Sequence, residues 1–427
     1  MKNPVRRLVA VGAALVVASA ALVGCGGSGG SGGSSGSGGD GQKSGAVEDV
    51  QFWGSWSGAQ AKQLEAQATA FNDSQDKYHV TYVAKEAVEE SLLTGLASGR
   101  VPDVVLWDRY NTPLYVSKNA LAPVDDYLAK DGVDVKQFYD QALSEMVVGG
   151  HTYGLPLLVD NRSLYYNQTL LDQAGAKPPK TWDELKAVAE KTAEHNGGKI
   201  TKAGFALSDP GLFSMWLSQA GGSMYDGSGT KTAFNSAQGL DVLNFWKGLL
   251  DANVYKLGFG EGADAFAQGD VAMKYDGPWA LADLEKAKVS YGIAQPATGP
   301  NGDKGAIMGG FGLVIPNGAK NADGAWAFMK WWATQPENGV NFAKISGWIP
   351  ANREAANDPY FTQNPSYAAF IQTMEYAKVR SHVPGASDVE SKALIPALEK
   401  FLAGEETAEQ ALTEAQQLGD KILADSN

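Results

Sequence analysis

Strand-like and helical patterns alternate along this chain from Val47 onwards, and this alternation restricts the possible folds more than any other feature. Residues 50–53 and 102–107 are rich in β-branched and aromatic side chains, as buried strands are. Between them, apolar side chains recur with helical spacing over residues 61–71 and 88–96. Strands separated by helices predict an α/β fold with mostly parallel sheets flanked by helices. With 427 residues, the chain is long enough for two such lobes.

The remaining segments continue the alternation. The pattern predicts further strands at residues 78–82, 271–275, 290–296 and 309–316. It predicts helices at residues 112–119, 181–195, 263–269, 323–334 and 336–345, and mostly helical structure from residue 366 onwards. The capping box Thr181-Trp-Asp-Glu184 begins one of these helices, and Ser236 is expected to cap a further one.

Residues 153–167 form a strand-like stretch that is interrupted by the polar triplet Asp160-Asn161-Arg162. A strand that presents a carboxylate, an amide and a guanidinium in its middle indicates backbone that passes through a water-filled cleft. We therefore expect this stretch to cross between two lobes, with residues 290–296 as the second crossing. The predicted boundaries are residues 46–157 plus 290–335 for lobe 1, and residues 158–289 plus 336–427 for lobe 2.

The first 45 residues are predicted to direct and anchor the protein rather than to fold with it. Residues 1–24 combine early basic residues with an apolar run, which is the pattern of a secretory signal peptide. The run ends in Leu22-Val-Gly-Cys25, which resembles the bacterial lipobox and predicts cleavage before Cys25 and lipidation of its thiol. Residues 25–45 are mostly Gly and Ser, as in a flexible tether. We expect an extracytoplasmic protein, lipid-anchored to the outer face of the cytoplasmic membrane.

The charge and the motif content exclude several classes of site. Removal of residues 1–24 takes away three of the 35 basic residues and none of the 48 acidic ones, which leaves a net charge of −16. A surface this acidic disfavours nucleic acid. The four His residues show no metal-ligand spacing, and no nucleotide-binding glycine motif is complete. We expect no metal, no cofactor and no catalytic residue, and hence a protein that is not an enzyme.

Aromatic and charged residues gather where the predicted strands end. The first strand is followed by Trp56-Ser57, the second by Glu86 and the third by Asp108-Arg109. Ligands of open α/β sheets bind just outside the carboxyl ends of the strands. Sugars suit these side chains, because carboxylates and guanidinium groups bind hydroxyl pairs and aromatic rings stack on the apolar faces of pyranose rings.

Several short stretches resemble, in their order and spacing, the bacterial extracellular solute-binding proteins of carbohydrate uptake systems, the family that includes maltose-binding protein. The resemblance extends over essentially all of residues 47–427. It is carried by Pro102-Asp-Val-Val-Leu-Trp107, Tyr153-Gly-Leu-Pro156, Leu164-Tyr-Tyr-Asn167, Pro179-Lys-Thr-Trp-Asp-Glu-Leu185, Phe266-Ala-Gln-Gly-Asp-Val-Ala-Met273, Asp276-Gly-Pro-Trp279 and Ala325-Trp-Ala-Phe328.

The resemblance implies a two-lobed fold like that of type II periplasmic binding proteins, each lobe a mostly parallel sheet flanked by helices, joined by crossing strands. It implies a monomer that captures a sugar or oligosaccharide between closing lobes and delivers it to the permease subunits of an ABC importer. By position, Asp160 matches a carboxylate that binds sugar hydroxyls, and Trp279 matches a stacking tryptophan. The turn around Ser55 to Ser57 and the segment Trp107-Asp-Arg109 match further sugar-contacting loops.

The candidate ligand-binding residues combine these positions with others proposed from their chemistry and neighbourhood. They are Trp56, Ser57, Glu86, Asp108, Arg109, Asp160, Arg162, Trp216, Asp276, Trp279, Gly310, Phe311, Trp348 and Arg380. For Asp108, Asp160 and Arg162, an ion pair between the lobes or a cap is the alternative role.

Three alternative functions remain open from the sequence. Arg109, Arg162 and Arg380 suit an anionic ligand such as a glycerol phosphate or a uronate. The second alternative is a surface-anchored glycoside hydrolase. Its two catalytic carboxylates are defined by their distance in space, so no sequence spacing reveals or excludes them. A sensor subunit for a signalling partner would use the same fold.

Overall fold

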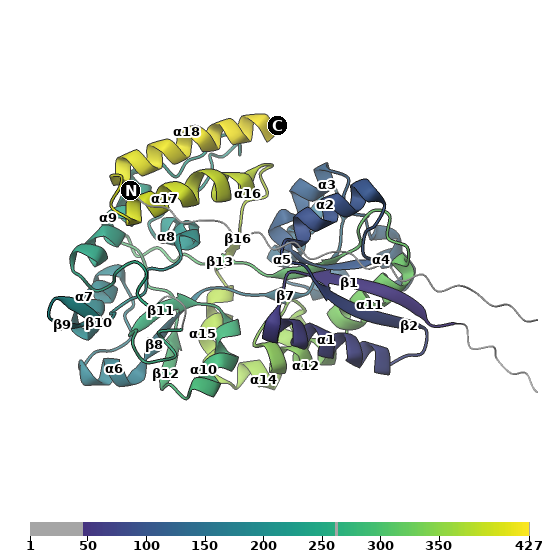
Figure 1. The fold of residues 1–427 in the computed structure, drawn as a ribbon, viewed down its shortest axis with the longest axis horizontal. Coiled ribbons are helices and arrows are strands. Elements are labelled where there is room, and N and C mark those ends of the chain that lie inside the picture. The colour runs from purple at the N-terminus through teal and green to yellow at the C-terminus, as the bar shows by residue number, and fades with distance from the viewer. Residues whose placement is uncertain (1–45, 261–263, 427) are drawn as a thin grey trace, which may run out of the picture. The chain divides into compact units, whose positions relative to one another are not determined.

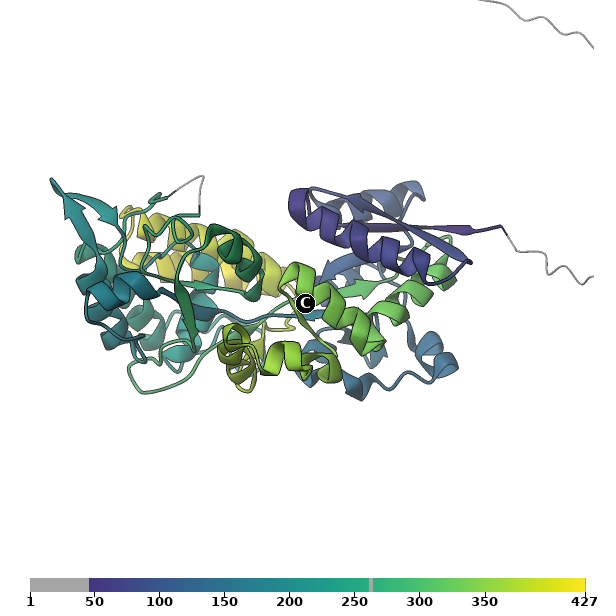
Figure 2. The same ribbon diagram turned by 90° about the horizontal axis from the view of Figure 1, so that it is seen from below.

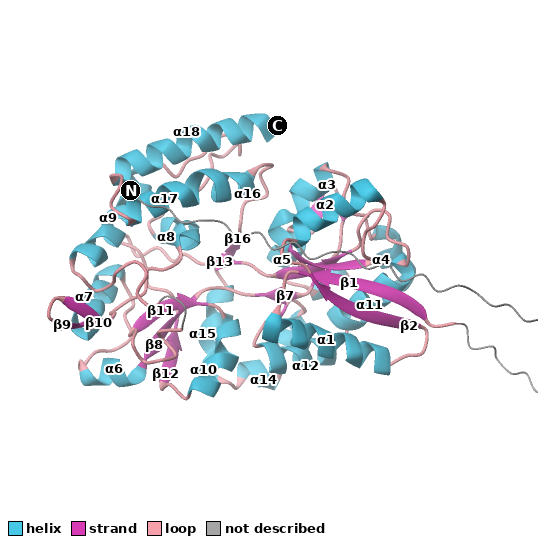
Figure 3. Cartoon of the chain, in the orientation of Figure 1, coloured by secondary structure: helices cyan, strands magenta, loops and turns pink. Residues whose placement is uncertain are grey.

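The computed structural model describes residues 46–260 and 264–426. These residues belong to one compact unit, Ala46–Asn427. The predicted signal peptide, the predicted lipidation site Cys25 and the predicted Gly/Ser tether lie outside the described residues. Within the compact unit the strands gather mainly in two separate sheets, each with helices packed around it (Figure 3). The two-lobed α/β fold expected from the sequence is therefore confirmed.

The first sheet has five strands in the order β2-β1-β3-β14-β6. They are β2 (Tyr78–Ala84), β1 (Glu48–Gly54), β3 (Val104–Asp108), β14 (Phe311–Val314) and β6 (Leu155–Pro156). The three strands β1, β2 and β3 pair in parallel, whereas β14 is antiparallel to both β3 and β6. Because β14 comes from much later in the chain than its neighbours, this sheet contains both ends of one chain excursion through the second lobe (Figure 1).

Helices cover both faces of the first sheet. On one face, Phe52 packs against Tyr82 at a ring distance of 5.0 Å and against Phe328 of α11 (Ala322–Thr334) at 5.3 Å. On the other face, Val105 and Trp107 pack with α2 (Val88–Ser98). Successive residues of β3 point to opposite faces, as the period of a strand requires.

Two further helices, α1 (Gly58–Asp73) and α12 (Pro336–Ser346), pack against each other in this lobe. The helix α1 also packs against β2, and Figure 2 shows α1 and α12 side by side. The side chain of Gln63 donates a hydrogen bond to the carbonyl oxygen of Ile345 at 2.9 Å. A segment beyond residue 335, assigned to lobe 2 from the sequence, thus packs against lobe 1.

The second sheet contains β11 (Met273–Asp276), β8 (Ser163–Asn167) and β12 (Tyr291–Ala294). Both pairings are antiparallel, so the expected mostly parallel sheet is wrong for these three strands. Parallel pairing with β11 is limited to isolated bridges, such as that between Ala206 and Lys274. The pairing of β12 with β8 also places residues 291–294 in the second sheet rather than in lobe 1. The exact lobe boundaries remain a prediction.

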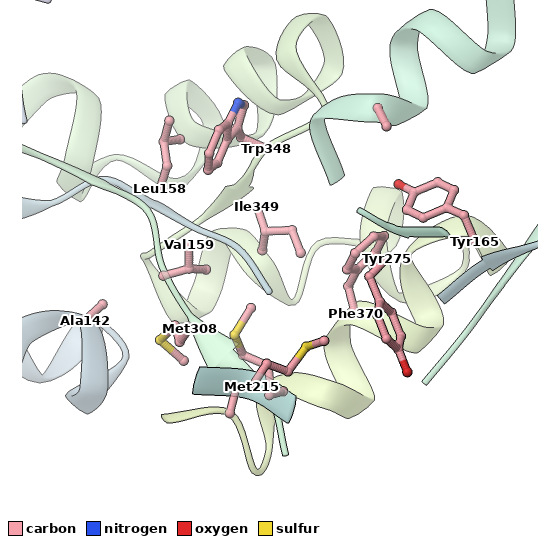
Figure 4. Close-up of a cluster of buried hydrophobic side chains, with 14 of the residues drawn as sticks. Ala142, Leu158, Val159, Tyr165, Met215, Tyr275, Met308, Trp348, Ile349 and Phe370 are labelled. Carbon is pink, nitrogen blue, oxygen red and sulfur yellow. The ribbon is translucent and has the colours of Figure 1, made fainter. Parts of the chain in front are cut away.

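The chain crosses between the sheets at β7 (Leu158–Val159), which pairs with β15 (Ile349–Pro350). Figure 4 shows Leu158 and Val159 close to Ile349 in the buried layer at this crossing. Directly after β7, Asp160 forms an antiparallel bridge with Gly309, with N–O distances of 3.3 and 3.1 Å. The first predicted crossing is therefore present. The second crossing, expected at residues 290–296, is not found there, because residues 291–294 pair with β8 in the second sheet. The segment that pairs with the first crossing contains Gly309.

A further pair of short strands lies beside this crossing. The strand β13 (Ile307–Met308) runs parallel to β16 (Lys378–Val379), and both are labelled between the two sheets in Figure 1. The segments after these strands carry Gly309-Gly310 and Arg380. Three stretches that are distant in sequence therefore meet where the lobes join.

The remaining helices surround these sheets. In lobe 1 and at the crossing they are α3 (Thr112–Ser117), α4 (Asp125–Asp131), α5 (Asp140–Ser144), α13 (Arg353–Ala356) and α14 (Pro359–Thr362). Around the second sheet they are α6 (Gln168–Gln173), α7 (Trp182–Thr192), α8 (Phe213–Gln219), α9 (Ala237–Asp251), α10 (Leu281–Ala287), α15 (Pro365–Met374), α16 (Ala386–Asp388), α17 (Ile395–Leu402) and α18 (Ala408–Ser426). Short strand pairs β4 (Val147–Val148) with β5 (His151–Thr152), and β9 (Glu194–Asn196) with β10 (Lys199–Lys202), complete the described elements.

Both predicted helix caps are confirmed, but one predicted helix ends early and another is not a helix in its described part. Thr181 accepts a hydrogen bond from the Glu184 amide at 3.2 Å, and Ser236 from the Gly239 amide at 3.2 Å. The helix after Thr181 ends at Thr192 instead of continuing to residue 195, because residues 194–196 pair with residues 199–202 as a short hairpin. Gly197 and Gly198 form its turn, with positive φ angles of 58° and 80°. Residues 265–269 form turns rather than a helix.

Candidate ligand-binding cleft

A cavity of about 350 Å³ lies at the junction of the lobes; we call it the cleft cavity. Its lining includes residues at the ends of β1, β3 and β14, residues of the crossing segments, and residues around the second sheet. Nine residues predicted from the sequence line it: Trp56, Asp108, Asp160, Arg162, Trp279, Gly310, Phe311, Trp348 and Arg380. The cavity therefore joins side chains of both lobes in one lined space.

Trp348 forms the centre of an aromatic wall in the cleft cavity. Its ring lies 5.6 Å from that of Trp56, nearly parallel at 27°, and 4.9 Å from that of Trp279 at 35°. The ring of Phe311 packs edge-on against Trp348 at 5.4 Å. The Nε1–H of Trp348 is buried and has no hydrogen-bond partner among the described residues. A ligand hydroxyl within reach of this donor would satisfy it.

An ion pair lies beside this aromatic wall. Arg162 donates a hydrogen bond from Nη1 to Asp160 Oδ1 at 2.5 Å. The same guanidinium lies over the ring of Trp279, 4.3 Å from its centroid. Asp160 is almost fully buried, and its backbone is fixed by the bridge to Gly309. Asp160 and Arg162 therefore form an ion pair within the cavity lining, but with each other on one crossing segment rather than between the lobes.

A second ion pair connects Arg380 to the end of β3. Arg380 Nη2 contacts both carboxylate oxygens of Asp108, at 2.8 and 2.9 Å, and its guanidinium lies 4.0 Å from the ring centroid of Tyr110. Glu390 lines the same region on a π-helical segment, Val389–Leu394. Burial raises the pKa of the Glu390 carboxyl, and the neighbouring Arg380 opposes that shift.

Gly310 lets the chain pass close to the first crossing. Its φ angle is 126°, and a Cβ atom there would lie 2.1 Å from the carbonyl oxygen of Leu158. A residue with a side chain would therefore need to separate two crossing segments. The glycine-rich entry to β14, noticed in the sequence, allows this approach and leaves backbone at the cavity wall.

Arg109 does not line the cavity, contrary to expectation. Its side chain is fully buried and its Nε donates to Glu145 Oε2 at 2.9 Å. The guanidinium also donates to backbone carbonyl oxygens, including that of Leu158, that of Gly309 at 2.7 Å and that of Phe311 at 3.1 Å. Arg109 thus ties together the crossing segments beneath the cleft, a structural role rather than ligand contact.

Trp216 is a core residue, so its assignment to the ligand site is wrong. Only 1% of its surface is exposed. Its ring packs edge-on against Tyr275 at 5.1 Å and against Trp182 at 5.4 Å. The residue lies on α8, whose inward face contributes to the core of the second lobe.

Three more predicted residues lie outside the cleft cavity. Ser57 is exposed at the start of α1, and Glu86 is exposed in the turn before α2. Asp276 lines a different cavity, where its carboxylate pairs with Lys274 at 2.7 Å. None of the three contributes to the aromatic wall formed by Trp56, Trp279, Phe311 and Trp348.

Sequence reasoning also missed several residues that line the cleft cavity. They are Gln60, Gly211, Leu212, Ser214, Ile307, Gly309 and Glu390. The pairing of Asp160 with Gly309 is a tertiary contact without a local sequence signal. Gln60 lies four residues after the predicted contact Trp56, near the start of the helix that follows Ser57. Residues four apart on a helix lie on the same side, and this spacing could have indicated that Gln60 faces the cavity.

The described residues show neither a metal-binding cluster nor a membrane-spanning helix. No group of three or more His, Cys, Asp or Glu residues in this part of the chain is arranged to hold a metal ion. Among the described helices, none combines the length and the apolar character that a membrane crossing requires.

Solved structures place this fold in a class of two-lobed binding proteins. The GacH receptor of Streptomyces glaucescens, solved unliganded and with acarbose, superposes with a TM-score of 0.80 at 24% identity, over 89% of this chain and all (100%) of that one. The sugar-binding protein MalE of Xanthomonas citri superposes with a TM-score of 0.75 at 25% identity, over 88% of this chain and 98% of that one.

Sequence comparison then identifies the family. The profile of the family described as "Bacterial extracellular solute-binding protein" matches residues 66–369, and the chain belongs to this family. A maltotriose-binding protein of Pyrococcus abyssi is 26% identical over 311 residues, which are 71% of this chain and 67% of that protein. A glycerol-3-phosphate-binding protein, UgpB of Yersinia enterocolitica, is 27% identical over 420 residues, 88% of this chain and 93% of that protein.

Proposed function

We propose that this protein is the substrate-binding component of an ABC importer and captures a neutral carbohydrate in the cleft cavity. The observation that carries the proposal is the wall of Trp56, Trp348 and Trp279, which faces the same cavity as Asp160 and Asp108. Aromatic rings offer stacking surfaces for the C–H faces of a sugar, and carboxylates accept hydrogen bonds from its hydroxyls. The family and the maltotriose-binding relative support this reading.

The arginine pairing favours a neutral ligand over the anionic alternative that the glycerol-phosphate-binding relatives suggest. Arg162 is paired with Asp160, Arg380 is paired with Asp108, and Arg109 is buried against Glu145. The cavity lining holds three carboxylates, those of Asp108, Asp160 and Glu390, against only two guanidinium groups. A phosphate or uronate entering this lining would face excess negative charge, and it would have to compete with carboxylates for cations already paired.

The mechanism follows from which elements supply the lining. Asp108 and Trp56 come from the first lobe, whereas Trp279 and Leu212 come from elements around the second sheet. A sugar that contacts both sets gains binding free energy only when the lobes are close together, so it shifts the population toward a closed state. No covalent step is required. Prolonged incubation with oligosaccharides should therefore release no new reducing ends.

The proposal is tested by calorimetry and thermal unfolding of the full-length chain with glucose, maltose, maltotriose, mannobiose, tagatose and glycerol 3-phosphate. At a concentration of a hundred times its Kd, a ligand stabilises the folded state by about 2.7 kcal/mol, which raises the Tm measurably. We expect at least one neutral sugar to bind and glycerol 3-phosphate not to bind. Binding of glycerol 3-phosphate alone would establish the anionic alternative instead.

The proposed location is the outer face of the cytoplasmic membrane, with Cys25 as the lipid attachment point and the protein as a monomer that docks on the permease. Two acyl chains on one residue suffice for stable membrane attachment. We expect the Cys25→Ser variant, expressed in a bacterium, to lose incorporation of labelled palmitate and to leave the membrane fraction. The matched control is Ser28→Ala in the adjoining tether, which should retain both properties. Membrane attachment of Cys25→Ser equal to that of the control would contradict the lipid anchor.

A further inference from the structure

A second cavity adjoins the cleft cavity; we call it the side cavity. Its volume is about 460 Å³, larger than the roughly 350 Å³ of the cleft cavity. Four residues line both spaces: Ser214, Ile307, Arg380 and Glu390. Because the two cavities share these walls, a ligand in the cleft cavity has a neighbouring space directly beyond Arg380.

The lining of the side cavity differs from that of the aromatic wall. Its polar groups are mainly hydroxyls and the backbone of a glycine- and serine-rich turn, residues 222–229. Leu217 and Val379 add apolar surface, and no tryptophan is present among its lining residues. A lining that alternates small hydroxyls with apolar patches suits a hydroxylated ring, which has polar edges and apolar faces.

The charges of the side cavity balance in number, and two of the four charged groups, those of Asp226 and Arg380, already have hydrogen-bond partners. Asp226 and Glu390 oppose Lys378 and Arg380. Asp226 accepts hydrogen bonds within its own turn, from the amide of Thr230 at 2.9 Å and from the Ser228 hydroxyl at 2.7 Å. The space therefore presents no concentrated charge of either sign and, like the cleft cavity, favours a neutral ligand.

Arg380 stands at the junction of the two cavities in a fixed position. Its Nη2 is held by Asp108, and the ring of Tyr110 supports the guanidinium plane. The two hydrogen bonds to Asp108 use only the Nη2 nitrogen of the guanidinium. The guanidinium N–H groups that Asp108 does not bind are candidate donors to a ligand hydroxyl at the point where a ligand would pass from one cavity to the next.

We propose that the ligand is an oligosaccharide that occupies both cavities, with one unit against Trp348 and Trp279 and further units beyond Arg380 in the side cavity. This inference rests on the proposed function. Pockets for small ligands typically have volumes of about 300–1,000 Å³, so each cavity alone is large enough to take a substantial part of a ligand. A monosaccharide in the cleft cavity would leave the larger of the two spaces to solvent.

The test compares chain lengths by calorimetry on the full-length protein. The probes are linear glucose and mannose oligomers of one to four units. In at least one series, we expect the trisaccharide to bind tenfold or more tightly than its monosaccharide, because only the longer ligand reaches the side cavity. The Ser223→Trp variant places a large side chain at an exposed position of the side-cavity lining. It should reduce the trisaccharide affinity toward that of the monosaccharide.

Ser117→Trp is the matched control. Ser117 is also exposed and also donates its hydroxyl to a backbone carbonyl oxygen, that of Leu114 at 2.7 Å, as Ser223 does to that of Tyr225 at 2.8 Å. It lies on α3, away from both cavity linings, and should leave the length dependence intact. Lys378→Trp, on a different segment of the side cavity, is a second blocking variant if Ser223→Trp unfolds.

The possible outcomes separate the two proposals. If no sugar of either series and no other neutral sugar of the screen binds, the proposed function fails and the side-cavity inference fails with it. If a neutral monosaccharide of the screen binds but no oligomer of either series does, only the side-cavity inference fails. If a monosaccharide binds as tightly as its trisaccharide, or if both blocking variants keep the full trisaccharide affinity, the side cavity is not part of the site. In that case the sugar-receptor function stands.

Discussion

The Arg109→Ala variant is expected to lose about 3–5 kcal/mol of folding stability, the usual cost of removing one partner of a buried ion pair. Glu145 is only 1% exposed and contacts Arg109 Nε at 2.9 Å, so its carboxylate would be left without its cationic partner. The carbonyl oxygens of Leu158, Gly309 and Phe311 would lose the same donor. Urea denaturation at neutral pH measures the loss.

The loss should depend on pH in a defined direction. Burial raises the pKa of Glu145 to about 7, although Arg109 opposes the shift. A carboxyl whose pKa is raised by folding binds its proton more tightly in the folded state, so stability falls as the pH rises from the unfolded pKa toward the folded one. Without Arg109 the folded pKa rises further. The variant should therefore be closest to the wild type near pH 5 and furthest from it near pH 8.

Arg100→Ala is the control for this prediction. Arg100 is exposed, so its replacement should change the unfolding free energy by no more than about 0.5 kcal/mol at either pH. A stability of Arg109→Ala within 1 kcal/mol of the wild type at pH 8 would show that the arginine does not tie the crossing segments together.

Asp108 and Arg109 show what a sequence can and cannot predict here. Both follow the buried run of β3 and both were expected at the ligand site, since residues there lie at the carboxyl end of a parallel strand. Only Asp108 lines the cavity, while Arg109 points into the protein beneath it. The sequence locates the end of the strand, but which neighbour faces the cleft depends on the local turn and on a partner, Glu145, that lies 36 residues away.

The crossing stretch was predictable because its chemistry changes within a few residues. An apolar run that ends abruptly in Asp160 marks the point where buried backbone reaches the cavity. Its partner strand was not predictable to the residue, because Gly309 pairs with Asp160 from about 150 positions further along the chain. Residues 290–296 have a similar strand pattern but pair with β8 in the second sheet.

Trp216 was predicted at the ligand site and is not there, whereas Glu390 lines the site and was not predicted. The helix α8 turns the ring of Trp216 into the core. Glu390 belongs to the stretch after residue 366, for which the sequence predicts only mostly helical structure. Tertiary packing brings it to the cavity beside Arg380. In both cases the orientation of a helix decides the role of the side chain, and local sequence does not specify that orientation.

Trp348 carries the largest expected effect on ligand binding. Its ring contacts those of Trp56, Trp279 and Phe311, so it links aromatic side chains from both lobes in one wall. Arg162 covers part of Trp279, which leaves Trp348 as the central ring of the wall. Well-packed aromatic side chains at the centre of a binding site commonly contribute 2 kcal/mol or more on truncation. For the Trp348→Ala variant we expect the Kd of the sugar identified in the screen to rise about 30-fold or more.

Loss of packing must be separated from loss of ligand contact, because Trp348 is only 5% exposed and its removal also leaves a void. Trp331→Ala is the matched control. Trp331 lies on α11, its ring centroid is 5.4 Å from that of Phe71, and it does not line the cleft cavity. Both variants should unfold at lower temperature than the wild type, but only Trp348→Ala should weaken sugar binding in calorimetry below the Tm of either variant. If Trp348→Ala keeps the wild-type Kd while its Tm falls, Trp348 supports the cleft without contacting the ligand, and Trp56 or Trp279 must supply the stacking surface.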